Sequence, residues 1–357
     1  MPFVAVIIVN WNGKKFLKTC LDSLIAQDYP PDKVNILLVD NGSRDDSIVI
    51  VRKYYPKVKI IQNKKNLGFA QANNIGINFS FDNPEVKYIL TLNNDTFMEK
   101  GYLSELVSFL ESKPRAGACV GKILMLDDKR VIDSAGDYIY KDKMEIMNRG
   151  KFEFDVGQYD KTEKAFSVCA AGALYRRELL KEVKLLGEYF DNDFFSYKED
   201  VDLSLRAHLM GWGIYYVPKA VMMHKGSGTS NKLSLEYKEY ISRRNRILMA
   251  VKNLPIGLMV KALIKYVFPL KIVWIYELPK RVLIKIYGNK ENRHKPAVEN
   301  SVIPRGKLSL VHIKACLSSL RLLPRALKKR KIIREKRKIT NKLFVSIFEE
   351  FSLIKKV

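Results

Sequence analysis

Polar side chains that could bind a cation or a nucleotide follow three short apolar runs near the start of the chain. They are Asn-Trp-Asn-Gly at residues 10–13, Asp-Asn-Gly-Ser at 40–43 and Asn-Asn-Asp-Thr at 93–96. Carboxylate and amide oxygens are ligands for hard divalent cations, and they also accept hydrogen bonds from the ring N–H of a base. An ordinary turn is the alternative for each stretch, because Asn, Asp and Gly are common turn formers. Asp95 is the first candidate functional residue, because a strand-like apolar run leads directly into its stretch.

Alternating strand and helix signals place those stretches at one edge of a sheet. Apolar runs at residues 3–9, 36–39, 58–62 and 88–92 are predicted as strands, with helical segments between them. This alternation predicts an α/β fold with parallel strands and right-handed crossovers. Because the carboxyl ends of parallel strands share one edge, we expect the polar stretches to converge on one crevice. Neither GxGxxG nor GxxxxGKS/T occurs on these turns, which disfavours a typical dehydrogenase and a P-loop NTPase.

The charge of the chain is concentrated in its last third. The 357 residues include 63 Lys and Arg against 38 Asp and Glu, a formal net charge of +25. Residues 1–230 hold 32 basic and 30 acidic side chains, whereas residues 231–357 hold 31 and 8. The length also exceeds that of a usual single domain. We therefore predict two regions, a near-neutral α/β domain at 1–250 and a basic helical region at 251–357.

Cysteine usage and hydropathy indicate a cytoplasmic protein. Four cysteines without a CxxC pair or dense spacing are typical of reduced thiols. The apolar start has no preceding basic residues and is too short for a signal peptide, so we interpret it as a first strand. No stretch reaches the roughly 20 uninterrupted apolar residues that a spanning helix needs. The most apolar window, residues 254–276, is interrupted by Lys261, Lys265, Lys271 and Pro269.

Basic and apolar residues alternate through the last third in a way that favours a membrane surface. In the segment 308–327, the predicted helix has Leu310, Ile313, Leu317 and Leu320 on one face and Lys314, Arg321, Arg325 and Lys328 on another. Such a helix is typical of interfacial membrane binding, and the basic stretch 328–338 adds attraction to anionic lipid. A solvated face or a homodimer interface is the alternative. Nucleic acid is not expected as a partner, because no binding motif or aromatic base reader accompanies the charge.

Six stretches of the chain, in order, resemble the family 2 inverting glycosyltransferases with the GT-A fold. They are VIIVNWNG, LLVDNGSRDDS, NKKNLGFAQANNIGI, ILTLNNDT, FFSYKEDVDLSLRAHLMGWGIYYVP and HKGSGTS. The nearest pattern is that of rhamnosyltransferase-type members, which build bacterial and archaeal surface polysaccharides. The resemblance covers residues 3 to about 250. It implies a Rossmann-like, mostly parallel sheet with flanking helices and a nucleotide-sugar donor.

The resemblance also implies the residues that bind the donor. Asp40 matches the Asp that accepts a hydrogen bond from the pyrimidine ring, and Trp11 lies where an aromatic side chain covers the base; a core aromatic is the alternative for Trp11. The NxG element near the nucleotide corresponds to Asn66 and Gly68, for which a plain loop and helix start is the alternative. The full donor set is Asn10, Trp11, Asp40, Asn66, Gly68, Asn94 and Arg244.

A divalent metal, Mg or Mn, is implied by the same resemblance. Asp95 matches the last Asp of the DxD element, which holds the ion on the donor diphosphate. The first position of that element is Asn93 here, which offers only a neutral oxygen or a water-mediated contact. His224 matches the late histidine that completes the metal site, although a lone histidine is more often structural.

Glu199 and Asp200 are the catalytic candidates. Acidic residues are favoured in the first turn of any helix by its dipole, which is the alternative explanation for the pair. The resemblance implies that Asp200 is the general base, which takes the proton of an acceptor hydroxyl in a single displacement with inversion. Glu199 would orient the site or touch the acceptor. Trp212 and Gly172 are predicted on the acceptor side, with a place in the core as the alternative for Trp212.

Together these features predict an inverting transferase at the inner face of the cell membrane. The donor would be a dTDP- or UDP-sugar, with rhamnose among the candidates, and the acceptor a glycan or a polyprenyl-linked sugar. The alternative is a non-catalytic protein that keeps the GT-A shell and binds the membrane or nucleic acid, because the metal element has lost its first Asp.

Overall fold

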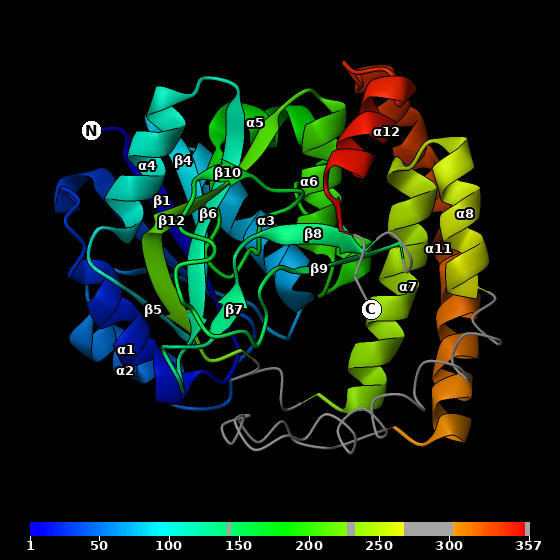
Figure 1. The fold of residues 1–357 in the computed structure, drawn as a ribbon. Helices are drawn as coiled ribbons and strands as arrows, with labels where there is room; N and C mark the ends of the chain where they lie inside the picture. Colours follow the sequence, from blue (N-terminus) through cyan, green and yellow to red (C-terminus); the bar gives the residue numbers. More distant parts are fainter. Residues whose placement is uncertain (141–143, 227–232, 268–302, 354–357) are drawn as a thin grey trace, which may run out of the picture.

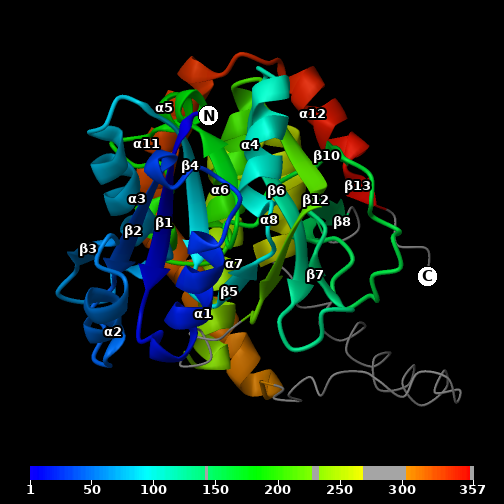
Figure 2. The same ribbon diagram turned by 90° about the vertical axis from the view of Figure 1, so that its left-hand side faces the viewer.

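The computed structural model describes residues 1–140, 144–226, 233–267 and 303–353, and its body is a central sheet between two layers of helices (Figures 1 and 2). The sheet has the strand order β10-β12-β6-β11-β4-β1-β2-β3. Its strands are β1 (Phe3–Asn10), β2 (Val34–Asp40), β3 (Lys59–Gln62), β4 (Val86–Asn93), β6 (Ala116–Met125), β10 (Glu163–Lys164), β11 (Leu174–Arg176) and β12 (Gly213–His224). Two short strands, β5 (Thr96–Met98) and β7 (Ile132–Ser134), pair with β12 and β6.

Helices cover both faces of this sheet, which explains why its central strands are continuous apolar runs. Figures 1 and 2 show α1 (Lys14–Ile25), α2 (Ser47–Tyr54) and α4 (Tyr102–Ser112) on one face. On the other face lie α3 (Gly68–Phe81), α5 (Arg177–Val183) and α6 (Glu199–Leu209). The first four predicted strands and the helices between them are confirmed, with boundaries that move by a few residues.

The parallel register brings the predicted polar stretches together. In the pairing of β1 with β2, Asn10 lies opposite Asp40, and in the pairing of β1 with β4, Val9 lies opposite Asn93. All three strands therefore end at the same edge of the sheet. The predicted α/β class with a GT-A type of sheet is confirmed.

Part of a charged excursion at residues 127–164 forms a small second sheet beside that edge. It consists of β8 (Asp137–Tyr140), β9 (Glu145–Asn148) and, from the far end of the chain, β13 (Ser352–Leu353). β8 pairs in parallel with β13 and in an antiparallel manner with β9. The last described residues thus complete a sheet that begins at the edge of the site.

A further layer of helices lies outside α6, on the right-hand side of Figure 1. It contains α7 (Leu235–Asn253), α8 (Ile256–Val267), α11 (Arg305–Lys336) and α12 (Asn341–Glu350). The helix predicted at 308–327 is confirmed and continues to Lys336. Part of the most apolar window, residues 254–276, lies outside the described residues. Across the described ranges, no helix is long and apolar enough to cross a membrane. The predicted boundary between residues 250 and 251 falls inside α7.

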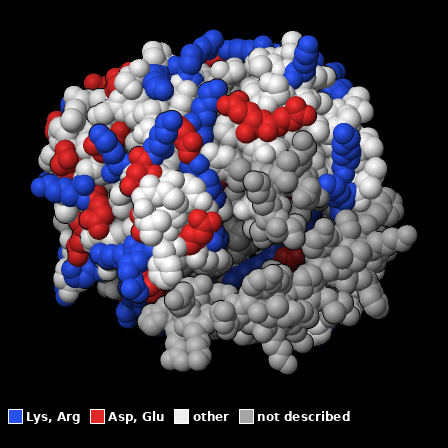
Figure 3. Space-filling model, viewed as in Figure 1, with Lys and Arg blue, Asp and Glu red and all other residues white. Residues whose placement is uncertain are grey.

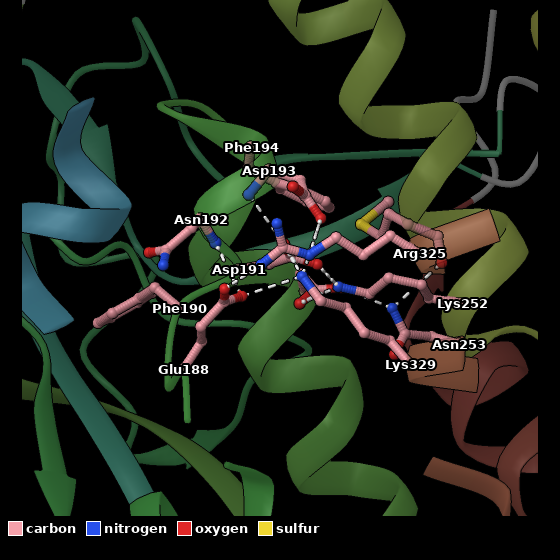
Figure 4. Close-up of polar contacts among 12 residues, drawn as sticks. Glu188, Phe190, Asp191, Asn192, Asp193, Phe194, Lys252, Asn253, Arg325 and Lys329 are labelled. Atoms are coloured by element: carbon pink, nitrogen blue, oxygen red, sulfur yellow. Dashed lines mark hydrogen bonds and ion pairs between the residues drawn. The ribbon is translucent and has the colours of Figure 1, made fainter. Parts of the chain in front are cut away.

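Buried ion pairs join α11 to the segment that precedes α6 (Figure 4). The Lys329 ammonium is fully buried and donates to Glu188, Asp191 and Asp193. Lys252 on α7 donates to the other oxygen of Asp191. Removing one member of such a buried network leaves an uncompensated charge, which costs about 3–5 kcal/mol. These contacts fix the acidic segment against α7 and α11.

Candidate active site

The ends of β1, β2 and β4 are tied together by amide and carboxylate side chains. Asn10 Nδ2 donates to Asp40 Oδ1 at 2.9 Å, and Asn94 Nδ2 donates to Asn10 Oδ1 at 2.7 Å. Gly13 allows this approach, because a Cβ at that position would lie 2.0 Å from Asn94 Nδ2. The three polar stretches therefore form one connected edge, as the parallel fold predicts.

A cavity of about 480 Å³ lies at this edge and collects most of the predicted site residues. Among the predicted residues that line it are Trp11, Asn66, Gly68, Asn93, Asn94, Asp95, Glu199, Asp200 and His224. They come from the ends of β1, β4 and β12, from the start of α3 and from the first turn of α6. One cavity therefore brings together the donor, metal and catalytic candidates.

One corner of the cavity is built around His224, the last residue of β12. Its Nε2 lies 3.3 Å from Asp95 Oδ1 and 3.2 Å from Asn93 Nδ2, and its Nδ1 lies 3.0 Å from Asp133 Oδ2. Burial alone would lower the pKa of His224, but hydrogen bonds and charges from Asp133 and Asp95 raise it to about 9. The Asp133 carboxylate thus fixes the ring with one nitrogen directed at Asp95.

This corner fits a divalent ion with few protein ligands. A carboxylate and an imidazole nitrogen converge, and the other nitrogen is held by a carboxylate, as is usual for a metal-binding histidine. Within the described part of the chain, no three His, Cys, Asp or Glu side chains form a closed metal cluster. A cation at Asp95 and His224 would therefore need further oxygen ligands, which diphosphate oxygens and water can supply. Asn93 adds an amide, not a second carboxylate.

The opposite corner holds Asp200 at the start of α6. Its Oδ2 accepts the Ala170 N–H at 3.2 Å, and its Oδ1 accepts the Val201 N–H at 2.8 Å. Burial raises the pKa of Asp200, while these two N–H groups and the Lys198 charge favour the ionised form. Burial and the neighbouring Asp200 raise the pKa of Glu199 well above its usual range. Of the pair, Asp200 is the carboxylate best able to act as a base.

The backbone that leads into this corner is strained. Phe195, Tyr197 and Lys198 have φ angles of 63°, 68° and 69°, a region that non-glycine residues rarely adopt. Asn245 on α7 holds this stretch, because its Nδ2 donates to the carbonyl oxygens of residues 194, 196 and 197. Arg244 adds hydrogen bonds to the carbonyls of residues 193 and 194. Helix α7 therefore positions the first turn of α6.

Five predicted site residues do not line the cavity. Asn10 and Asp40 are buried just behind it, where Asp40 also accepts hydrogen bonds from Ser43. Arg244 is not among the lining residues, and its Nη2 donates to the two backbone carbonyls named above.

The two acceptor-side predictions are corrected by packing. Trp212 is buried in the core, with its Nε1 donating to Glu182 at 3.0 Å. Gly172 lies beneath Tyr102 and Met222, where a Cβ would come within 2.2 Å of the Met222 sulfur. Gly172 therefore leaves room for protein side chains.

Several residues of the site were not predicted. Asp133, Asp137, Lys151 and Lys198 all line the cavity. The first three come from short elements of the excursion at 127–164, whose two- to four-residue strands have no readable periodicity. The pattern Asp-Ser-Ala-Gly-Asp at 133–137 gave no clear signal either, because Asp, Ser and Gly are common in ordinary turns.

A family comparison agrees with this geometry. Residues 5–184 match the model described as glycosyl transferase family 2. The fold is that of GT-A transferases, and the chain belongs to glycosyl transferase family 2. It therefore has a role in glycosyl transfer.

Characterised relatives act on lipid-linked sugars according to their names. The chain is 29% identical over 239 residues to the N-acetylglucosaminyl-diphospho-decaprenol L-rhamnosyltransferase of Mycobacterium tuberculosis, covering 61% of this chain and 75% of the relative. It is 25% identical over 229 residues to a dolichyl N-acetyl-alpha-D-glucosaminyl phosphate diacetamido-dideoxy-glucuronosyltransferase of Methanococcus voltae, covering 62% and 66%.

Solved structures share the fold across most of the chain. The S. aureus TarS 1–349 complex with UDP-GlcNAc has a TM-score of 0.55 and 16% identity, covering 98% of this chain and 91% of that one. The mannosyltransferase of Pyrobaculum calidifontis with GDP-Man and Mn²⁺ has a TM-score of 0.52 and 19% identity, covering 89% and 87%. At these identities the likeness concerns the fold.

Proposed function

We propose that this protein is an inverting, metal-dependent glycosyltransferase that moves a sugar from a dTDP- or UDP-sugar, with rhamnose among the candidates, to a glycan or polyprenyl-linked acceptor. The observation that carries the proposal is the single cavity shared by Asp95, His224 and Asp200. Had these side chains faced separate cavities, the non-catalytic shell protein would be the better interpretation. The lipid-linked substrates in the names of the relatives support the choice of acceptor.

In the proposed reaction the chain supplies one base and a rigid frame. Trp11, Asn66 and Gly68 lie where the nucleotide would bind, and Asp95 with His224 would hold the cation. When bound, that ion supplies positive charge that stabilises the departing diphosphate. Asp200 takes the proton of the acceptor hydroxyl while that oxygen bonds to the anomeric carbon and the bond to the diphosphate breaks. The nucleoside diphosphate leaves, and the configuration of the sugar is inverted.

We also propose that the protein acts at the cytoplasmic surface of the membrane through α11. Its apolar stripe, defined here as Leu310, Ile313, Leu317, Leu320 and Leu327, is between 48% and 61% exposed. Exposed Lys and Arg side chains accompany the stripe on the same helix, and α8 adds exposed apolar residues with lysines. In Figure 3 the charged atoms along the right-hand edge, where α8 lies, are blue. An apolar stripe with a basic border suits an anionic lipid surface.

The Asp200→Asn variant tests the proposed reaction. We expect transfer to fall by about 10²–10⁴-fold, because Asn cannot accept the hydroxyl proton. Nucleotide binding should stay near that of the wild-type protein, since Asp200 lies on the acceptor side. Transfer would be followed from a panel of dTDP-, UDP- and GDP-sugars with Mn²⁺ or Mg²⁺ to N-acetylglucosaminyl-diphospho-polyprenol, with nuclear magnetic resonance reading the anomeric configuration of the product.

Glu178→Gln is the matched control, because Glu178 is an exposed acid in the first turn of α5. Equal transfer by Asp200→Asn and by this control would remove the base assignment. A product with retained configuration would exclude the single displacement. If the wild-type protein transfers no sugar from any donor, the non-catalytic alternative would be the better interpretation.

A further inference from the structure

Asp137 is a buried carboxyl of the cavity to which the proposed reaction gives no role. It begins β8 and is 4% exposed. Its Oδ2 accepts a hydrogen bond from Ser167 Oγ at 2.5 Å. Its Oδ1 has no hydrogen-bond partner among the described residues. A buried polar atom without a partner costs about 1–3 kcal/mol, so an atom of this kind that lines a binding cavity indicates a ligand contact.

The same short stretch of chain anchors Asp137 and Asp200 side by side. Ser167 donates to Asp137, and the Ala170 N–H, three residues later, donates to Asp200. Both carboxyls line the one cavity, and so does Glu199, whose Oε2 likewise lacks a partner within the described chain. Two carboxyl oxygens without partners among the described residues therefore belong to the cavity that Asp200 lines.

Charged groups on neighbouring segments act on Asp137. Asp200 and Lys198 face it from the start of α6, Lys151 faces it from the excursion, and Cys169 lies near it on the 167–170 stretch. Burial and then the Asp200 charge raise the pKa of Asp137 to about 7. Near neutral pH, part of the Asp137 population is therefore protonated. A carboxyl in this state can both accept from and donate to a sugar hydroxyl.

We propose that Asp137 is a further acceptor-binding residue, whose Oδ1 takes a hydroxyl of the acceptor sugar next to the hydroxyl that Asp200 deprotonates. The acceptor residue is then a neutral sugar with at least two neighbouring free hydroxyls, because a uronate would bring a negative charge toward Asp200, Asp137 and Glu199. This inference rests on the proposed glycosyl transfer and assigns a contact that the family resemblance does not supply.

Acceptor kinetics of Asp137→Ala test the contact. With N-acetylglucosaminyl-diphospho-polyprenol as acceptor, we expect its KM to rise about 5- to 100-fold, the effect of losing one hydrogen bond to a buried polar group. The KM of the donor and the slow hydrolysis of the donor without acceptor should stay at wild-type values, because neither needs Asp137. Asp137→Asn should recover most of the acceptor KM, since an amide can also bond a hydroxyl.

The control is Asp82→Ala, which removes an exposed Asp on the turn after α3. An acceptor KM within twofold of wild type in Asp137→Ala would overturn the proposal, as would a parallel loss of donor affinity, which indicates a structural role. If Asp137→Ala does not fold, Asp137→Leu provides the same comparison, because Leu has nearly the shape of Asp but no polar atom. Failure of the proposed function is distinct, because the wild-type protein would then neither transfer nor hydrolyse a sugar donor.

Discussion

Single buried side chains set how this protein responds to pH. His208 on α6 is packed against the Phe166 ring, with its Nε2 2.8 Å from the Phe166 carbonyl. Burial lowers the pKa of His208 to about 4 from its usual 6.5. Between pH 4 and pH 6.5, the unfolded chain therefore binds a proton at His208 that the folded chain does not bind. The contribution of neutral His208 to stability is complete above pH 6.5 and is lost as the pH falls toward 4.

The His208→Gln variant should show a weaker pH dependence of stability. Gln can keep a hydrogen bond to the Phe166 carbonyl but has no proton to gain. For the wild-type protein, His208 contributes a slope of up to about 1.4 kcal/mol per pH unit to the free energy of unfolding in this window. Urea unfolding at pH 7 and pH 5 measures the difference. Identical slopes in both proteins would show that His208 is not the titrating group.

At the same scale, the sequence predicted residues that follow strong local signals. Asp95 was predicted because it follows a clear apolar strand, and Asp200 because the family resemblance implies a general base at that position; both line the cavity. Asp133 and Asp137 were not predicted, because strands of three or four residues are stabilised by neighbours distant in sequence. Trp212 was left open between the acceptor side and the core, because whether a side chain faces a cavity or the core depends on what packs over it.

Among the elements, α11 has the most unexpected role. The sequence predicted its apolar stripe and treated the stretch 328–338 as exposed charge for lipid. In the structure Lys329 and Arg330 point inward, so less of that charge is free than the sequence indicates. Arg330 donates to the carbonyls of Val251 and Leu254, and Lys329 meets three carboxylates. Charge runs give no sign of such pairing, because the partners lie 76 to 141 residues away in the sequence.

Replacing Lys329 by Met should destabilise the protein by about 3–5 kcal/mol, because Glu188, Asp191 and Asp193 would lose a buried cation. The loss of stability should be greatest in the segment before α6. Because this segment leads into Asp200, sugar transfer should also decrease. Hydrogen exchange of residues 188–198, together with urea unfolding, measures both effects. The neighbouring, exposed Lys328→Met is the control. If the two variants exchange and unfold alike, the network of Figure 4 does not hold the catalytic segment.

For the whole molecule, the sequence predicted the α/β class and the regional charge. The packing of the basic helical region on the α/β domain emerged only from the structure. The helical region shares buried contacts with the catalytic segment, and β13 completes the sheet that begins with Asp137. A test of membrane binding by deleting residues 254–357 would therefore disturb the site as well. Substitutions on the outer surface of α11 can instead test membrane binding without disturbing the site.

Changing Leu310, Ile313, Leu317 and Leu320 to Ser should release the protein from anionic vesicles. The four changes remove exposed apolar area and leave the inward face of α11 intact. Flotation with vesicles of phosphatidylglycerol and phosphatidylcholine at low and high salt measures binding, which should weaken with salt in the wild-type protein. Ile25→Ser with Val49→Ser, two exposed apolar positions on α1 and α2, is the control. Unchanged flotation of the quadruple variant would refute the role of the stripe.

The ion pair between Asp193 and Lys329 has a consequence for biosynthesis. The two residues are 136 positions apart, so a ribosome must add all of the intervening chain before the acidic segment can meet its lysine. Contacts of such long sequence separation form late in folding. We therefore expect the sheet of a nascent chain to form first. The chain should become catalytically competent last, once α11 has docked.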